Sequence, residues 1–260
     1  MALITTDSII LKTQRLGEAD KLLTVFTVAR GKLRAVAQGA RRTRSRFGGS
    51  LEPFTHGRLV LFEKKPGALC RLNQADIRHP FLGIRADLER IEAAAQMTWL
   101  VAALTPDGEA HSELYTLLLH GLARVESASD LGLVRPFFAL RLLDAAGFRP
   151  RVDRCLRCQG GLERGAPVFA AALGGTVCAA CQRQGGARDR GAPVSHGTLA
   201  FMARAPRLPW DRLERHRLMP VMLAELNQIL EMHIGQILGR AIPVAFKTQK
   251  LSSEFRRLGC

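Results

Sequence analysis

Four cysteines form two closely spaced pairs, Cys155 with Cys158 and Cys178 with Cys181, and 19 residues separate the pairs. Two residues lie between the cysteines of each pair, a spacing that lets two thiolates from one tight turn bind the same tetrahedral ion. Four thiolates fill the coordination sphere of zinc and leave no position for an activated water. The pattern therefore predicts one structural Zn²⁺ and directs the search for function toward binding.

Disulfides and chance placement are the alternatives for these cysteines. Residues 1–7 show no basic segment followed by an apolar run, as a secretory signal would, and no stretch approaches the roughly 18 apolar residues of a membrane span. We therefore expect a cytoplasmic protein without a membrane partner, and disulfides are rare in that compartment. Two correctly spaced pairs also disfavour chance. Cys70 and Cys260 stand alone and are predicted to be a core thiol of a strand and a free terminal thiol.

The charge of the chain points to a polyanion. The net charge is +15 and the isoelectric point is about 10.7, values that are typical of proteins that meet nucleic acid or an acidic membrane surface. Residues 1–78 hold 15 basic and 6 acidic residues, residues 79–149 hold 6 and 9, and residues 150–260 hold 17 and 8. Two basic ends thus flank a mildly acidic middle.

One stretch, residues 27–51, contains no acidic residue at all. Its basic residues lie on a predicted strand or in a glycine-flanked loop, where guanidinium groups are free to follow a phosphate backbone. Together with two lysines in the turn before the last predicted strand, they are the predicted DNA-binding residues: Arg30, Lys32, Arg34, Arg41, Arg42, Arg44, Arg46, Lys64 and Lys65. The alternative is a solvated surface that only keeps the protein soluble, which the summed charge disfavours.

The first 79 residues are typical of an all-β domain. β-branched and aromatic residues recur in short runs that turn residues separate, and they predict strands at 7–14, 21–29, 32–40, 57–63 and 69–77. Five short strands without intervening helices favour a small barrel such as the OB-fold. Phe26 and Phe62 are expected to fill this barrel, and Phe47 is expected either to stack on a base or to anchor its loop.

Helical periodicity begins after residue 79. Apolar residues at three- and four-residue intervals predict helices at 85–104, 112–127, 136–146, 195–202 and 219–240. The glycine-rich cysteine segment interrupts this series. The expected fold is therefore an α+β multidomain chain with an OB-fold at 1–79, an all-α domain in two parts at 80–149 and 187–260, and an inserted four-cysteine zinc finger at 150–186.

Signatures of catalysis are missing from the sequence. The dipeptide Gly31-Lys32 lacks the upstream glycine and the following Ser or Thr of a phosphate-binding loop. The second cysteine pair lacks the preceding proline and the H-x-E triplet of zinc deaminases. We therefore expect a protein that is not an enzyme. A nuclease without a recognisable motif stays an alternative, which the lack of clustered Asp, Glu and His disfavours.

Several segments resemble the family of the bacterial recombination mediator RecO. Residues 17–55 are similar to its N-terminal signature, residues 137–161 and 172–182 to its zinc module, and residues 232–240 to its last helix. The resemblance runs in order through nearly the whole chain. It implies an OB-fold, a helical domain and a zinc finger, binding of single- and double-stranded DNA, and annealing of complementary strands without nucleotide hydrolysis.

The resemblance also implies partners and residue roles. The family works with RecR and with single-stranded DNA-binding protein, and it helps to load the RecA recombinase during repair, so a place at the nucleoid follows. By position, the basic residues within 31–46 match the family's DNA-contacting segment and the four cysteines match its metal ligands. A sequence-specific regulator that reads DNA with the zinc module, near Arg154, Arg157 and Arg164, stays the alternative function.

Overall fold

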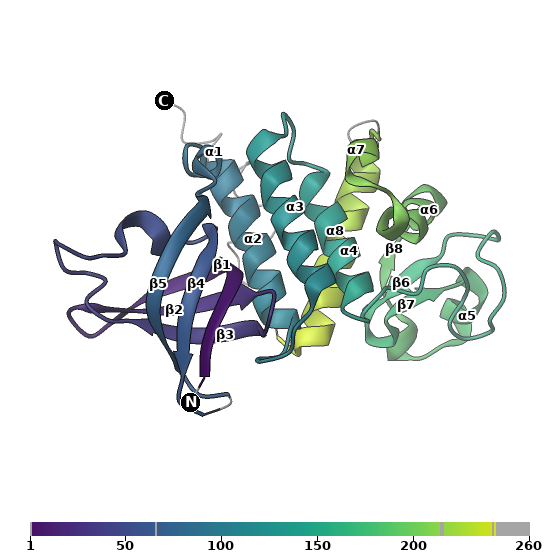
Figure 1. Cartoon of the computed structure of the whole chain (residues 1–260). Helices are drawn as coiled ribbons and strands as arrows, with labels where there is room; N and C mark the ends of the chain where they lie inside the picture. Colours follow the sequence, from purple (N-terminus) through teal and green to yellow (C-terminus); the bar gives the residue numbers. More distant parts are fainter. Residues whose placement is uncertain (1, 66, 214–215, 241, 243–260) are drawn as a thin grey trace. The chain divides into compact units, whose positions relative to one another are not determined.

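The structure is a computed structural model that describes residues 2–65, 67–213, 216–240 and 242. The chain divides into two compact units, residues 1–131 and residues 132–260 (Figure 1). The predicted free thiol of Cys260 and the proline of the 64–67 turn lie outside the described residues.

The first unit begins with a five-stranded closed barrel. Its strands are β1 (Ala2–Leu16), β2 (Asp20–Thr27), β3 (Gly31–Ala37), β4 (His56–Glu63) and β5 (Cys70–His79). The order around the barrel is β1-β2-β3-β5-β4, the arrangement of an OB-fold. β1 serves both sheets of the barrel, since its first half pairs with β4 and its second half with β2, and the register shifts between Ile10 and Lys12. The predicted five strands are thus confirmed.

The barrel interior follows from strand alternation. On β3 the residues Leu33, Ala35 and Ala37 are buried, whereas Lys32 and Arg34 face outward. The core is completed by Phe47, which is 4% exposed and comes from the loop between β3 and β4, next to the short 3₁₀ helix η1 (Gly48–Leu51). The arginine loop is therefore anchored in the barrel by its own aromatic side chain.

Two predictions for phenylalanines were wrong. Phe26 is fully buried, yet it is not part of the barrel's core cluster; its ring stacks on Tyr115 at a centroid distance of 6.2 Å. Phe62 is only half-buried, because the neighbouring Leu61 takes the inward position on β4. Both rings alternate out of the barrel, and Phe47 belongs to its core cluster instead.

Three helices complete the first unit: α1 (Leu82–Arg85), α2 (Leu88–Leu104) and α3 (Ser112–Ser127). The side chain of Asp87 caps α2 by accepting a hydrogen bond from the amide of Arg90 at 2.9 Å. The guanidinium of Arg90 in turn donates to the carbonyls of Val125, Glu126 and Ala128 at the end of α3. Carbonyls at a helix C-terminus lack intrahelical partners, so this contact satisfies them and fixes α2 against α3.

The second unit combines helices with a small sheet. Its helices are α4 (Val134–Ala145), α5 (Ala179–Gln184), α6 (His196–Arg204), α7 (Trp210–Leu213) and α8 (Pro220–Leu238). The sheet has the order β7-β6-β8 and consists of β6 (Val168–Ala170), β7 (Gly175–Val177) and β8 (Ala192–Pro193). Three 3₁₀ turns, η2 (Ala171–Leu173), η3 (Ala187–Asp189) and η4 (Ala205–Arg207), connect these elements. The helices at 136–146, 195–202 and 219–240 are confirmed with small shifts at their ends.

Two hydrogen-bonded contacts organise this unit. Ser195 caps α6 through its hydroxyl, as predicted, and Glu225 on α8 accepts hydrogen bonds from the hydroxyls of Ser195 and Thr198 at 2.7 and 2.6 Å. His233 on α8 contacts the carbonyl of Phe148 through Nε2 at 2.8 Å. Within the described part of the chain, no helix is long and apolar enough to cross a membrane.

Candidate metal centre and nucleic-acid interface

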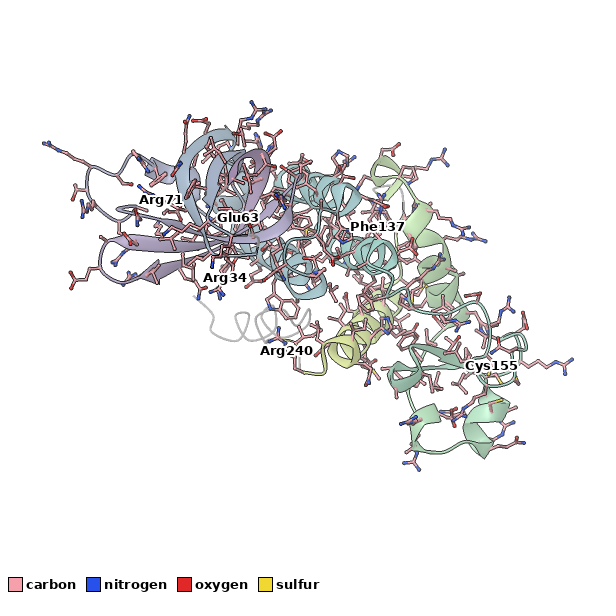
Figure 2. All side chains as sticks on the ribbon, turned by 60° about the horizontal axis from the view of Figure 1, so that its bottom comes forward. Arg34, Glu63, Arg71, Phe137, Cys155 and Arg240 are labelled. Carbon is pink, nitrogen blue, oxygen red and sulfur yellow. The ribbon has the colours of Figure 1, made fainter. Side chains whose placement is uncertain are left out.

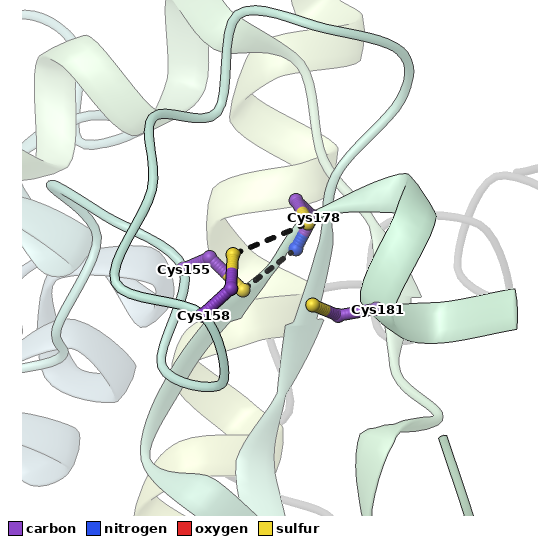
Figure 3. A group of neighbouring side chains, drawn as sticks. All are labelled: Cys155, Cys158, Cys178 and Cys181. Atoms are coloured by element: carbon purple, nitrogen blue, oxygen red, sulfur yellow. Dashed lines mark hydrogen bonds between the residues drawn. The ribbon is translucent and has the colours of Figure 1, made fainter. Parts of the chain in front are cut away.

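The two cysteine pairs lie on two tight turns that face each other. In the first turn the amide of Gln159 donates to the carbonyl of Cys155 and the amide of Cys155 donates to the carbonyl of Gly160, both at 2.9 Å. Gln159 adopts a left-handed conformation with φ of 59°, which turns the chain back on itself. In the second turn Cys178 is the N-cap of α5 and Cys181 lies in its first turn. Figure 3 shows all four side chains converging from these segments.

The sulfur positions fit one tetrahedral ion. The four Sγ atoms lie within 4.8 Å of one another, and those of Cys158 and Cys178 are 3.9 Å apart (Figure 3). A tetrahedron with metal–sulfur bonds of about 2.3 Å has sulfur–sulfur edges of about 3.8 Å. The fold thus brings the two predicted cysteine pairs together, although the cysteines of one pair lie 20 or more positions from those of the other.

Backbone amides prepare the centre for thiolates. Burial opposes ionisation of Cys155, but hydrogen bonds from the amides of Cys178 and Arg157, both at 3.4 Å, help to lower the pKa of this thiol to about 6. Hydrogen bonds with the sulfurs of Cys178 and Cys158 favour the neutral form of Cys181 and raise its pKa to about 12. A metal that takes all four sulfurs must therefore displace at least the proton of Cys181.

An ion pair links the first cysteine turn to the segment after α5. Asp189 is 1% exposed and accepts hydrogen bonds from Nε and Nη2 of Arg157, the latter at 2.9 Å. The same carboxylate accepts the amide of Gly186 at 3.0 Å, and the Arg157 hydrogen bond is the largest cause that holds the pKa of Asp189 below its usual value. Because Arg157 lies between two of the cysteines, this two-pronged contact supports the turn that carries them.

The predicted DNA-binding residues lie mostly on the surface of the barrel unit. Arg30 precedes β3, Lys32 and Arg34 lie on its outer face (Arg34 is labelled in Figure 2), and the other residues occupy the β3–β4 loop and the β4–β5 turn. All of the predicted residues except Lys32 are exposed, namely Arg30, Arg34, Arg41, Arg42, Arg44, Arg46, Lys64 and Lys65. The structure thus presents a basic surface of eight exposed cations.

The loop that carries four of these arginines is held in place. Nη1 of Arg41 donates to the carbonyls of Gly17 and Glu18 at 3.1 and 2.7 Å, which ties the loop to the β1–β2 turn. The guanidinium of Arg46 lies 4.9 Å from the ring centre of Phe47, whose side chain is in the barrel core. The contacts of Arg41 and of Phe47 therefore hold this loop at two positions, although its arginines are exposed.

Lys32 differs from the other predicted residues because its ammonium has partners within the chain. Its ammonium donates to the carbonyls of Ala102 and Thr105, both at 2.6 Å, and lies 3.2 Å from the carboxylate of Asp107. An ammonium group has three N–H donors, and these contacts occupy them. Lys32 thus stabilises the C-terminal end of α2 and the chain that follows it, and these contacts occupy the ammonium that was predicted to bind phosphate.

Sequence reasoning missed residues near this surface. Phe62 and Arg71 are register partners of the β4–β5 pair, and both alternate away from the barrel interior. Leu69, which precedes β5, is 52% exposed. Leu59, Leu61 and Glu63 alternate inward on β4, which places Phe62 on the outer face. The sequence therefore contained the information needed to predict the position of Phe62.

Two family models match the chain in succession. The model described as Recombination protein O N terminal matches residues 1–81, and the model described as Recombination protein O C terminal matches residues 85–244. The first covers the barrel, and the second covers α2 through α8, including the four cysteines.

Curated relatives agree with these matches. The DNA repair protein RecO of Desulfitobacterium hafniense is 32% identical over 93% of this chain and 88% of the relative. Proteins of the same name from Anaeromyxobacter sp. and Rubrobacter xylanophilus are 38% and 34% identical, over 75% and 80% of this chain and 76% and 83% of the relative. The chain therefore belongs to the RecO family of DNA repair proteins.

Proposed function

We propose that this protein is a recombination mediator that binds single- and double-stranded DNA without sequence preference and anneals complementary strands without ATP. In the same proposal it helps to load the RecA recombinase onto strands that single-stranded DNA-binding protein covers, with RecR as a direct partner, and it works in the cytoplasm at the nucleoid. It performs no covalent chemistry. The observation that carries the proposal is the basic surface on the barrel.

The size of this surface sets the expected strength of binding. Of its eight cations, six have side chains without a hydrogen bond, ion pair or aromatic-ring contact among the described residues: Arg30, Arg34, Arg42, Arg44, Lys64 and Lys65. Each phosphate that a cation neutralises adds about −0.7 to the slope of log K against log salt for a single strand. Six such contacts give a slope of about −4, so binding should be strong at low salt and weak at high salt.

A second basic surface supports annealing over simple binding. The cysteine module and the segment that follows it, residues 150–190, carry seven exposed arginines against three acidic residues, one of which is the buried Asp189: Arg151, Arg154, Arg157, Arg164, Arg183, Arg188 and Arg190. Figure 2 shows nitrogen-tipped side chains projecting from the ribbon around Cys155. Two strands repel each other through their phosphates, and a chain with two basic surfaces lowers that repulsion for both strands.

The module is poorly suited to reading sequence. Its only helix among the described residues of the cysteine segment, α5, spans six residues, which is less than two turns. Readers of the major groove insert a longer helix whose side chains contact base edges. The sequence-specific regulator is therefore the weaker hypothesis, and contact of this module with the DNA backbone fits the proposal better.

The metal in this proposal is one structural Zn²⁺. Soft thiolate ligands in a tetrahedral arrangement suit zinc, and Cys155, Cys158, Cys178 and Cys181 would hold it. A zinc ion bound by four thiolates supplies folding free energy to the module and no catalysis. Arg157 and Asp189 position the first turn for it.

Strand annealing tests the proposal. Two complementary labelled single strands are mixed with the protein in the absence of ATP at salt concentrations from 0.05 to about 0.5 M, a range over which phosphate contacts lose most of their strength. Faster duplex formation that declines steeply with salt is the expected result. Tight binding without acceleration would contradict the annealing activity, and binding without salt dependence would contradict the basic surface as its agent.

A further inference from the structure

A cavity of about 390 Å³ opens in the barrel unit between the start of β3, the β4–β5 turn and the segment after α2. It is lined by basic, apolar and acidic side chains together, among them Arg30, Leu33, Arg34, Glu63, Leu69 and the backbone of Gly108. Its volume falls within the range of about 300–1,000 Å³ that is typical of pockets for small organic groups.

The cavity exists because β3 and β5 pair over a short distance. Their parallel register includes only Ala35 with Cys70 and Val36 with Arg71. Before these pairs the two strands part, and β5 is preceded by the exposed β4–β5 turn. The space between Leu33 and Leu69 is therefore left without the backbone hydrogen bonds that close the rest of the barrel.

The walls and the rim differ in chemistry. Leu33 and Leu69 both line the cavity: Leu33 belongs to the barrel core and is 7% exposed, whereas Leu69 is 52% exposed and leaves a large apolar side chain uncovered. Arg30 and Arg34 are exposed beside them, with no hydrogen-bond or ion-pair partner within the described chain. An apolar slot with cations at its edge matches a nucleotide, which has a flat base and an anionic phosphate.

The two carboxylates at the cavity do not cancel this positive rim. Glu63 is 5% exposed, and its Oε1 accepts the amide of Gly67 at 2.9 Å, so it holds the β4–β5 turn. Asp107 is exposed, and its charge is offset by the ammonium of Lys32 at 3.2 Å. The lining thus holds three basic side chains against two carboxylates, and the exposed charges without an ion-pair partner among the described residues are those of Arg30 and Arg34.

The cavity is also preformed. The amide of Gly108 donates to the carbonyl of Lys32 at 2.9 Å. The ammonium of Lys32 donates to the carbonyls of Ala102 and Thr105, so the end of α2 and the segment after it are both attached to β3. Gly31, at φ of 59°, permits this close approach, because a Cβ at this position would collide with the carbonyl of Glu109. A ligand would therefore find one wall already in place and bind with a small ordering cost.

We infer that this cavity holds one unpaired nucleotide of a single DNA strand, with its base against Leu33 and Leu69 and its flanking phosphates at Arg30 and Arg34. The inference rests on the proposed DNA binding and adds a site that tells single strands from duplexes. A base in a duplex is stacked and paired, so it cannot enter such a cavity, whereas a base in a single strand can.

The test compares three nucleic acids of equal length: a single strand, the same strand with abasic sites throughout, and a duplex. Because the abasic strand keeps the phosphates, the wild-type chain should bind the normal strand about fivefold or more tightly than the abasic one, as expected for contact with a base. Leu69→Gln should reduce this ratio below about twofold and leave duplex affinity unchanged. The matched control is Leu82→Gln on α1, since Leu82 is 67% exposed and does not line the cavity.

The outcomes separate this inference from the proposed function. Equal affinity of the wild-type chain for normal and abasic strands would overturn the base-holding cavity while DNA binding stands, and this comparison needs no variant to fold. An equal loss of duplex affinity in Leu69→Gln would likewise overturn it. Failure to bind any of the three nucleic acids would overturn the proposed function itself.

Discussion

Lys32 and Arg34 offer a sharp test, because the sequence treats them alike and the structure separates them. Both alternate outward on β3, and both belong to the predicted DNA-binding set. Methionine in place of either residue keeps much of the apolar stem and removes the charge. We expect Arg34→Met to weaken DNA binding without loss of stability, and Lys32→Met to lower stability with a much smaller effect on DNA binding.

The magnitude for Arg34 follows from counterion release. One lost phosphate contact should make the salt slope for a single strand less steep by about 0.7 and weaken binding about fivefold at 0.1 M salt. The loss of affinity should shrink toward zero as salt approaches 1 M, because the release of counterions into a concentrated salt solution no longer favours binding.

The magnitude for Lys32 follows from its three contacts. Hydrogen bonds to charged groups contribute about 1.5–3 kcal/mol each in favourable cases, but the side chain of Lys32 is 15% exposed and that of Asp107 is 68% exposed, so solvent weakens at least the ion pair. We expect Lys32→Met to cost about 2–3 kcal/mol, which corresponds to a fall in Tm of roughly 5–10 °C for a unit of this size.

Two assays on the same protein samples separate the effects. Fluorescence anisotropy with a labelled single strand at several salt concentrations gives the slope, and thermal unfolding gives Tm. A Lys32→Met variant that loses as much salt slope as Arg34→Met, with Tm unchanged, would refute the structural role of Lys32. A fall in Tm for Arg34→Met would show that Arg34 is not the free cation that the structure presents.

Three further predictions concern the second unit. Cys155→Ser should lose stoichiometric zinc and lower Tm, and zinc retained in metal analysis would show that the ligand set is wrong. Asp189→Asn removes the charge that holds Arg157 and should speed zinc loss to a chelator several-fold, whereas Asp153→Asn, a 73% exposed carboxylate, should not; equal rates would exclude the clamp. Burial lowers the pKa of His233, so the unfolded chain takes up a proton below about pH 6.5 that the folded chain resists, and stability should fall as pH drops from about 6.5. His233→Gln, which keeps a donor for the Phe148 carbonyl, should lessen this fall in pH-dependent denaturant melts, and an unchanged profile would exclude His233 as its source.

The helices and strands in which apolar residues recur at regular intervals were predictable from the sequence. Four of the five barrel strands and the long helices α2, α3 and α8 were predicted within three residues of their ends, because alternation and helical spacing repeat over many residues, whereas β1 begins five residues before its predicted start. The sheet of β6, β7 and β8 was missed. Its strands have two or three residues each, too few for any period to show.

The candidate metal site was easier to predict than the candidate DNA surface. The cysteine pairs needed only the assumption that two turns face each other, and the structure brings all four sulfurs together. The role of Lys32 depends on carbonyls some 70 residues away at the end of α2, and no local pattern carries that information. The burial of Phe47 is likewise decided by the barrel interior, since its neighbours Arg46 and Gly48 suggest an open loop.

The short pairing of β3 with β5 has a consequence for the dynamics of the barrel. A closed barrel is as resistant to opening as its weakest strand pair, and two register pairs contribute less local stability than the seven or eight pairs that join the other neighbours. Amide protons at this junction should therefore exchange with solvent sooner than those of β1. A strand of DNA that contacts Arg34 on β3 and Leu69 before β5 would bridge the junction, so protection of these amides should rise on binding and report occupancy of the site without any label on the nucleic acid.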